Sequence, residues 1–469
     1  MNLSLNYESH HNAIYRSDVA QRSSMDSVLF SITSWTFITI LAVLLALTAY
    51  AVNIASENIA AGKYHTVSLV ARINWVAGWV VFCGMNGILV WFASTIVMYV
   101  SPPAAGSGIP DVKSYLNGID VPGILSFRTL VAKVLGSVGS VAGGLAVGKE
   151  GPFVHTGACI AHLIGSFGNT VSKARETPRV KAFLSKHAWI DVYTRMLTRF
   201  HLDINMRDIV TCGAAGGVAA AFRAPVGGVL FVLEEGATFY TNPLLWRCFY
   251  TTAIVVIALK GMMKVCAEGK CGHFGLGNFI IFEIRSGQSD FEINELVPLV
   301  ILGLLGGVLG SAFTAINGYL CLWRRDVLSK YGARARILEV LCVSLLTSTI
   351  AYWFSSVVSC RPCPLGNIKC PNSSGHSGNY VQFLCPDGEY SDLATLLVTS
   401  QENAIRNLFS SNTEHEFRIS TLVVFLALYY SLAIVTYGIA VPSGLFVPSI
   451  MIGSAYGRIV GIAMSNLAG

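Results

Sequence analysis

The stretch Gly148-Lys149-Glu150-Gly151-Pro152 joins two apolar runs, at 125–147 and 152–168, and carries two charged residues. A charged side chain at the bilayer centre costs about 2.5–3.5 kcal/mol on insertion scales, so such residues are functional by default. Glycine and proline interrupt helices, and a broken membrane helix persists only where protein or a water-filled path satisfies its backbone. The stretch therefore predicts a broken membrane helix with a functional carboxylate, Glu150.

The composition of the whole chain agrees with a membrane setting. Of its 469 residues, 53% are hydrophobic and 12% are charged, whereas a soluble domain is about 25% charged. This composition excludes a soluble enzyme and a disordered chain. The net charge of +6 is not concentrated in a run that would suit nucleic acid. We predict an all-α, polytopic protein of the lipid bilayer that is not an enzyme, needs no cofactor or metal and binds no nucleic acid.

Apolar runs suited to membrane helices recur along the chain. They fall at 28–55, 75–101, 125–147, 152–168, 209–233, 244–264, 295–322, 337–358, 421–437 and 445–466. A span needs about 20 residues, and several of these runs are shorter or broken by Gly and Pro. Such interruptions in both halves of a chain indicate inverted repeats around a transport site. The polar residues at 1–27 predict a cytosolic tail, followed by a transmembrane domain at 28–469.

Two further interrupted stretches, Gly106-Ser107-Gly108-Ile109-Pro110 and Gly444-Leu445-Phe446-Val447-Pro448, share this design. Small residues let a backbone approach a ligand closely, and free N–H groups at helix N termini bind anions. The Ser107 hydroxyl and the backbone at Gly108, Ile109, Leu445 and Phe446 are therefore candidate anion ligands. For either stretch alone, a plain turn or a kinked helix is the alternative.

The charged stretch suits an anion site better than a nucleotide site. Gly143, Gly148 and Lys149 nearly match a phosphate-binding loop, but Glu150 stands where that loop needs Ser or Thr to meet the metal. A carboxylate at a helix N terminus competes with an anion for the same place. Protonation would remove Glu150 from that place, so it is a candidate gate, with Lys149 and Gly151 beside the anion.

Glu234 and Glu235 end the apolar stretch that began at Ala214. Paired acids at the end of a membrane helix are either an interfacial cap or a proton donor and acceptor reached from water. The residues themselves leave both interpretations open.

Six cysteines lie in hydrophilic segments. They are Cys266 and Cys271 in one segment and Cys360, Cys363, Cys370 and Cys385 in the loop at 359–392. Two apolar runs separate the two groups, so all six cysteines lie on one face. The positive-inside tendency separately assigns the basic segment at 169–208 to the cytosol. Cys360 and Cys363, with His376, also fit half a zinc site, but the sequon at Asn372 favours disulfides on a lumenal or extracellular side.

Together the three interrupted stretches resemble the anion-path signatures of the CLC family of voltage-gated chloride channels and chloride/proton exchangers. They occur in the family's order, and the segments Gly106–Asp120, Gly148–Ala158, Cys212–Glu235 and Asn407–Asn412 look most like plant-type eukaryotic members. The resemblance implies a CLC-type fold with inverted repeats and re-entrant helices, over nearly the whole chain from about residue 30.

The resemblance also implies roles for single residues. Ser107 corresponds to the central-site serine, which favours chloride over nitrate. Glu150 corresponds to the external gate, and Glu235 to the internal proton acceptor of exchangers, where channels usually carry an apolar residue. The implied function is chloride/proton antiport across the membrane of a vacuole, Golgi or endosome. A channel of the same fold and a transport-incompetent subunit are the alternatives.

The family pattern continues beyond the last residue of this chain. Family members carry a tyrosine that closes the central site, dimer-interface helices and paired CBS domains after the Gly444–Pro448 stretch, whereas this chain stops at Gly469. We expect a C-terminally truncated member, for which the family's homodimer is in question.

Overall fold

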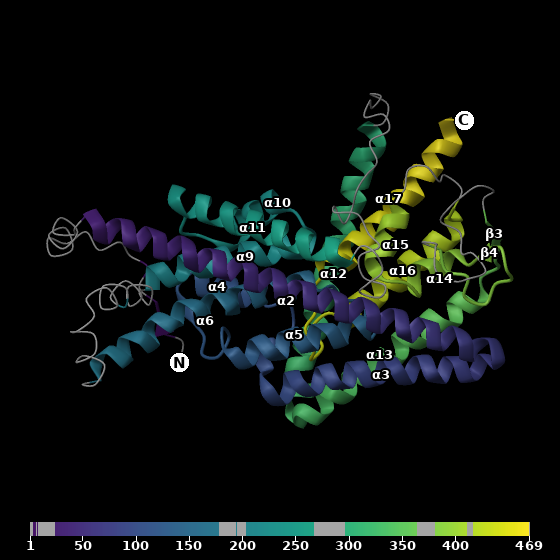
Figure 1. The fold of residues 1–469 in the computed structure, drawn as a ribbon. Coiled ribbons are helices and arrows are strands. Elements are labelled where there is room, and N and C mark those ends of the chain that lie inside the picture. The colour runs from purple at the N-terminus through teal and green to yellow at the C-terminus, as the bar shows by residue number, and fades with distance from the viewer. Residues whose placement is uncertain are drawn as a thin grey trace. The chain divides into compact units, whose positions relative to one another are not determined.

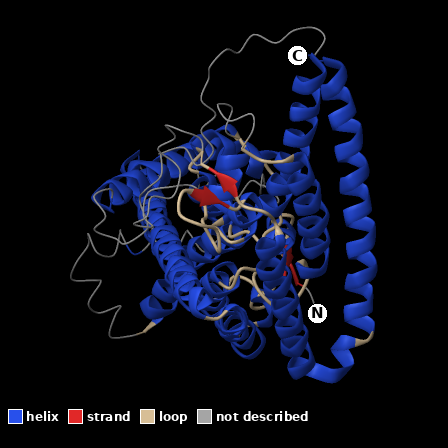
Figure 2. Ribbon diagram, turned by 90° about the vertical axis from the view of Figure 1, so that its right-hand side faces the viewer, coloured by secondary structure: helices blue, strands red, loops and turns tan. Residues whose placement is uncertain are grey.

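The computed structural model describes residues 3–5, 7, 24–177, 194, 203–266, 296–363, 380–409 and 416–468. Cys271, Cys370, His376, the sequon and much of the basic segment at 169–208 lie outside these residues. Helices dominate the described part, with two short antiparallel strand pairs (Figure 2). The pairs join β1 (Leu3–Ser4) to β2 (Ile119–Asp120) and β3 (Arg361–Pro362) to β4 (Glu389–Tyr390).

The helices follow most of the predicted apolar runs (Figure 1). They are α2 (Ser24–Ile73), α3 (Trp75–Val100), η1 (Pro102–Ala104), α4 (Ile109–Leu116), α5 (Phe127–Ala142), α6 (Glu150–Glu176), α9 (Asp203–Phe222), α10 (Pro225–Phe231), η3 (Val232–Gly236), α11 (Asn242–Cys266), α12 (Leu296–Asp326), η5 (Leu328–Tyr331), α13 (Gly332–Val357), α14 (Asp392–Leu397), α15 (Gln401–Leu408), α16 (Ile419–Thr436) and α17 (Phe446–Ala468).

Some helices depart from the runs that predicted them. Helix α2 continues to Ile73, well past the expected end near residue 55. The run at 209–233 is broken at Arg223, whose φ of 55° lies in the left-handed region. Pro225 explains the break, because proline disfavours helical geometry at the residue before it and is well suited to the first turn of α10.

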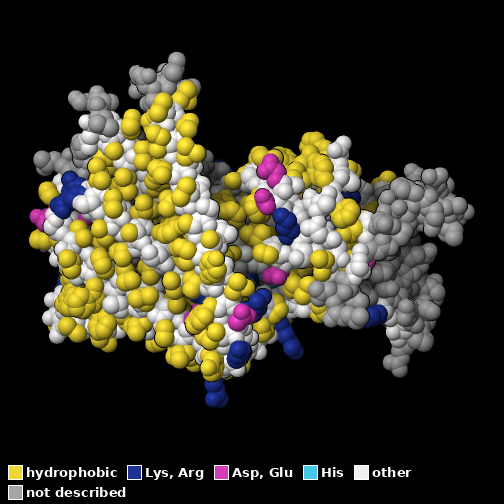
Figure 3. Space-filling view, turned by 180° about the vertical axis from the view of Figure 1, so that it is seen from behind, with side chains coloured by type: hydrophobic (Ala, Val, Ile, Leu, Met, Phe, Trp, Pro, Cys, Tyr) yellow, Lys and Arg dark blue, Asp and Glu magenta, His cyan; other side chains and the backbone are white. Residues whose placement is uncertain are grey.

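Six stretches of the described residues are long and apolar enough to cross a membrane. They are Val28–Ile73, Trp75–Val100, Asn242–Cys266, Leu296–Val357, Ile419–Thr436 and Phe446–Asn466. Apolar side chains cover much of the described surface in Figure 3, and charged side chains are sparse there. A surface of this kind suits lipid, because lipid tails can contact exposed apolar side chains without the cost that water imposes.

The chain divides into two compact units. Unit 1 comprises Met1–Val52, Ser107–Val134 and Glu150–Cys266, and unit 2 comprises Asn53–Gly106, Leu135–Lys149 and Ala267–Gly469.

In unit 1, helices α6 and α9 pack so closely that their backbones are in contact. A Cβ atom built on Gly157 would lie 2.1 Å from the Gly213 carbonyl oxygen, and one on Gly217 would lie 2.3 Å from the Phe153 oxygen. Membrane helices gain contact in this way, because small residues let two backbones approach where no hydrophobic effect drives them together. The helix that begins with Glu150 is therefore held against α9 through glycines.

A larger side chain at this contact is expected to destabilise unit 1. In Gly213→Leu the new Cβ would lie 2.3 Å from the Gly157 oxygen, so the two backbones must separate. Overpacking of this kind costs about 1–3 kcal/mol, which thermal unfolding of the purified protein in detergent would detect. Gly261→Leu is the matched control, because nothing lies within 4 Å of its Cβ position. Equal melting temperatures for the two variants would contradict the proposed packing.

Part of the N-terminal tail is fixed in unit 1. Beyond the β1–β2 pair, the Tyr7 hydroxyl donates a hydrogen bond to the Tyr115 carbonyl oxygen at 2.7 Å. The Arg207 guanidinium lies 5.2 Å from the ring centroids of both Tyr7 and Phe239. Burial raises the pKa of Tyr7 well above its ordinary value, and the nearby Tyr115 adds to the shift. The start of the tail is therefore part of the fold at the C-terminal end of α4.

In unit 2, two non-helical segments lie in a core shared with α3 and α13. Leu145 and Val147 precede Gly148, and Val441 precedes the Gly444 stretch; each is at most 1% exposed. They pack with Val90 of α3 and Val340 of α13, and these two helices lie beside each other (Figure 1). This core fixes the segments that lead into two of the three interrupted stretches.

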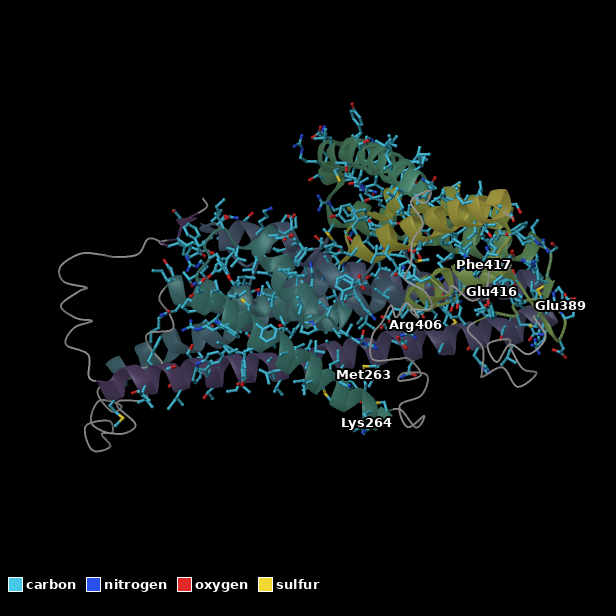
Figure 4. All side chains as sticks on the ribbon, turned by 90° about the horizontal axis from the view of Figure 1, so that it is seen from above. Met263, Lys264, Glu389, Arg406, Glu416 and Phe417 are labelled. Carbon is cyan, nitrogen blue, oxygen red and sulfur yellow. A yellow bond between two sulfur atoms is a disulfide. The ribbon has the colours of Figure 1, made fainter. Side chains whose placement is uncertain are left out.

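A disulfide-bonded layer covers another part of unit 2. Cys360 and Cys385 form a disulfide with a Cα–Cα distance of 5.7 Å. The neighbouring β4 places the Tyr390 hydroxyl 2.7 Å from the Glu416 carbonyl oxygen, to which it donates a hydrogen bond. Figure 4 shows Glu389, Glu416 and Phe417 in this region. Burial raises the pKa of Tyr390 to about 12, so the hydroxyl stays a donor across the physiological pH range.

Candidate functional site

Within unit 2, backbone hydrogen bonds join Gly106 and Gly148, which lie in the first two interrupted stretches along the chain, to the segment at 441–444. The Gly106 N–H donates to the Val441 oxygen at 2.9 Å, and the Ser443 N–H donates to the Gly106 oxygen at 3.0 Å. Gly148 and Gly444 exchange two such bonds, each 2.8 Å long. The Gly106 and Gly148 stretches thus both meet the segment at 441–444, which precedes α17. Gly106 and Gly148, which are distant in the chain, are therefore both bonded to this one segment.

The stretch from Gly106 to Pro110 leads directly into α4. Ser107 is 7% exposed, and its Oγ accepts a long hydrogen bond, 3.4 Å, from the Ile109 N–H. Gly108 caps the helix with a φ of 78°, and a Cβ there would lie 2.1 Å from Nδ1 of His155. Only glycine fits this position, because both the backbone geometry and the close histidine exclude a side chain. The buried Ser107 hydroxyl thus lies beside the N terminus of α4.

The charged stretch places its two charges differently. Lys149 Nζ lies 2.6 Å from Oε1 of Glu402, in an ion pair whose side chains are 9% and 13% exposed. Glu150, the next residue, is the first of α6 and is 4% exposed; Gly151 beside it is also buried. The first turn of a helix favours a carboxylate or an anion. Because a carboxylate engages the Lys149 ammonium, we propose that Lys149 positions the stretch instead of binding the anion directly.

The Lys149–Glu402 pair is expected to contribute strongly to stability. Glu402→Gln removes the carboxylate that lies 2.6 Å from the Lys149 ammonium, and removal of one partner from a buried pair typically costs about 3–5 kcal/mol. Thermal unfolding should show a large loss for Glu402→Gln that the added change Lys149→Met partly recovers. Additive losses in the two single variants and the double variant would show that the pair is not energetically coupled.

The last stretch supplies the start of another helix. Leu445 immediately precedes α17, Phe446 is its first residue, and both are partly buried. The Ser449 N–H donates to the Leu445 oxygen at 3.0 Å, so helical bonding begins there. The backbone N–H groups of the first turn of a helix have no partner within the helix. Leu445 and Phe446 thus stand at a helix N terminus, where anions are favoured.

The paired acids lie in a segment of unusual geometry. Val232–Gly236 forms a π-helix, and Glu234 and Glu235 are both exposed. π-Helical turns are rare and often mark functional sites. Glu235 Oε2 lies 3.5 Å from Lys113 Nζ at the end of α4, with side chains 64% and 52% exposed. Glu235 is therefore open to water and lies beside a cation.

The cysteines of the loop do not form a metal site in the described residues. Cys360 is bonded to Cys385, and Cys266 and Cys363 are disulfide-bonded as well. In the described part of the chain, no cluster of His, Cys, Asp or Glu could hold a metal ion. A disulfide consumes the thiolates that zinc needs, and the pairing follows from the fold rather than from cysteine spacing.

Sequence reasoning missed the residues that hold the charged stretch from outside. Glu402 pairs with Lys149, and Gln401 Nε2 donates to the Leu145 oxygen at 3.2 Å. Both lie on the amphipathic α15, in a segment that no apolar run marked. The available signal was charge: a lysine inside an apolar stretch needs a partner, and Glu402 is one of few acids able to supply it.

Comparison with known proteins shows which family this chain belongs to. A family model described as "Voltage gated chloride channel" matches residues 87–469. Chloride channel protein CLC-d of Arabidopsis thaliana is 45% identical over 98% of this chain and 56% of its own length. H(+)/Cl(-) exchange transporter 7 of Homo sapiens is 33% identical over 99% of this chain and 55% of its own. The chain thus spans about half the length of these relatives.

Solved structures show the same fold. A eukaryotic CLC transporter has a TM-score of 0.60 and 22% identity, covering 94% of this chain and 62% of its own. A slow cyanobacterial Cl−/H+ antiporter has a TM-score of 0.64 and 20% identity, covering 93% of this chain and 79% of its own. The expected helical fold of the CLC type is therefore confirmed, and the chain belongs to the CLC family of voltage-gated chloride channels and transporters, as a plant-type member.

Proposed function

We propose that this protein moves chloride across a membrane in exchange for protons. The backbone hydrogen bonds that join Gly106 and Gly148 to the segment at 441–444 support this proposal most strongly. By the family resemblance, the groups proposed to form the anion path are the Ser107 hydroxyl, the backbone at Gly108, Ile109, Leu445 and Phe446, and the carboxylate of Glu150. Helix N termini supply partial positive charge without a fixed cation, so an anion is attracted and can still leave.

In this proposal Glu150 is the gate and Glu235 is the internal proton acceptor. An ionised Glu150 occupies the anion path, and its protonation frees the path and carries a proton. Its neighbour Gly151 lies beside the path, and Lys149 fixes the preceding backbone through Glu402. Glu235 exchanges protons with water, as its exposure allows. Antiport follows because the carboxylate and the anion compete for one place.

The relatives' names support anion transport but divide on its type. One is named a chloride channel protein and another an H(+)/Cl(-) exchange transporter. The exposed acid at Glu235 favours exchange, because a channel needs no internal proton acceptor. Chloride is the proposed anion, with nitrate the less favoured one, since by the family resemblance Ser107 corresponds to the central-site serine.

The proposed location is an organelle membrane, with the disulfide-bonded layer on the lumenal side. Disulfides such as Cys360–Cys385 persist in oxidising compartments. The choice of an organelle over the cell surface follows from the resemblance to plant-type members. A fluorescent fusion examined beside organelle markers tests it, and signal confined to the cell surface would contradict it.

Transport by the purified chain in liposomes tests the function. Vesicles loaded with chloride and diluted into chloride-free buffer should take up protons as chloride leaves, and a pH-sensitive dye inside reports the acidification. A channel of the same fold would release chloride without this proton uptake. A subunit incapable of transport would produce neither change.

A further inference from the structure

Lys63 is a buried cation inside the first membrane stretch, and the proposed mechanism does not use it. It belongs to Val28–Ile73, which is long and apolar enough to cross a membrane, and only 1% of its surface is exposed. Its Nζ donates to Oδ1 of Asn86 at 2.8 Å and to the Ala142 oxygen at 2.7 Å. The rings of Tyr64 and Phe82 lie 4.7 Å and 5.5 Å from Nζ.

Packing alone does not account for a lysine at this place. In the described part of the chain, the hydrogen bonds of its ammonium go to neutral oxygens rather than to a carboxylate. A methionine of similar length would fill the same space without the cost of burying a charge. Charges kept inside membrane segments are functional by default, so the charge itself must act on something nearby.

What the ammonium holds is the C-terminal end of α5. Ala142 is the last residue of this helix, where backbone oxygens lack helical partners and the helix dipole places negative charge. A cation at this end satisfies an oxygen and offsets that charge. Asn86 also donates to Ser348 Oγ of α13 at 2.8 Å. Lys63 thereby links α2, α3 and α13 to the end of α5.

Residues 143–149, the gate segment, connect Ala142 to Glu150. The gate segment begins with a tight turn, in which Gly144 has a φ of 74° and a Cβ on Gly143 would lie 2.4 Å from Val90. Its far end is held by the Gly148–Gly444 backbone pair and the Lys149–Glu402 ion pair. Lys63 fixes the near end, through Ala142. A shift of Ala142 would therefore distort the gate segment, because the segment is short and its far end is fixed.

We propose that Lys63 is a positioning residue for transport, which holds the end of α5 so that the gate segment delivers Glu150 to the anion path. This inference rests on the proposed role of Glu150 as the gate. A merely structural lysine would change how much protein folds, and would lower chloride and proton movement by the same factor. A positioning lysine changes the number of protons moved per chloride.

The test compares Lys63→Met, Lys63→Arg and wild-type protein in liposomes, with proton and chloride movement measured in the same vesicles. In Lys63→Met the protons moved per chloride should fall by at least about threefold, since misplacing a reacting group by about an ångström can cost far more. Lys63→Arg keeps the charge and should restore most of the ratio. Asn86→Ala removes one acceptor and should lower the ratio too, which keeps the test open if Lys63→Met does not fold.

A double variant separates this inference from the proposed function. In a Glu150→Ala background there is no gate to position, so Lys63→Met should leave the remaining chloride flux nearly unchanged. An unchanged proton-to-chloride ratio in Lys63→Met, or an equal loss of flux with and without Glu150, would overturn the role of Lys63 alone. Wild-type protein that moves chloride without protons would overturn both proposals.

Discussion

Glu150→Ala is expected to carry chloride at a rate that no longer depends on pH, and to move no protons above the background of empty liposomes. In wild-type protein, lowering the pH protonates Glu150 and removes its charge from the anion path, so chloride flux should rise as pH falls. The variant lacks the competing carboxylate at every pH. Glu150 is 4% exposed at the start of α6, where a helix N terminus can hold an anion in its place.

The measurement is chloride efflux over a series of pH values, with proton movement followed in the same vesicles. Asp326→Ala is the control, because Asp326 is an exposed acid that pairs with its neighbour Arg325, and it should keep the wild-type pH dependence. If Glu150→Ala retained that dependence as well, another group would have to be the gate. The α6–α9 glycine contact should keep the variant folded, since it involves no atom of Glu150.

Glu235→Ala is expected to abolish proton coupling while chloride still moves. The side chain is 64% exposed in the π-helical segment and lies 3.5 Å from Lys113. Its removal takes away the group that receives protons from water, but it leaves the glycine stretches of the anion path intact. Chloride should therefore move down its gradient without acidifying the vesicles. The fold should tolerate the change, because exposed pairs contribute little to stability.

Glu234→Ala is the matched control for this second result. Glu234 is the adjacent acid in the same π-helical segment and is also exposed, so it shares the local charge and geometry. Coupling should survive in Glu234→Ala and be lost in Glu235→Ala. The reverse outcome would move the proton acceptor to Glu234, and persistent coupling in both variants would remove it from this pair.

Much of the fold could be predicted because its signals are local. Apolar runs of sufficient length predicted most of the helices, and Gly and Pro clusters predicted where membrane helices break. The break at Arg223 was missed because the surrounding residues are small and apolar, so the run at 209–233 looked continuous. Helix α15 was missed because it is short and amphipathic rather than apolar.

The sequence by itself determined the membrane class, the family and the few charged residues able to act inside apolar stretches. In a chain with so little charge, Glu150 stands out by composition alone. Only the tertiary structure decided which residues hold the segment that leads to it. Glu402 forms an ion pair with Lys149, Gly444 exchanges backbone hydrogen bonds with Gly148, and Lys63 donates a hydrogen bond to Ala142 at the end of α5. These partners are distant from one another in the chain. A single sequence gives the identity of each side chain, but it does not show which distant residue pairs with a buried charge or hydrogen-bonding group.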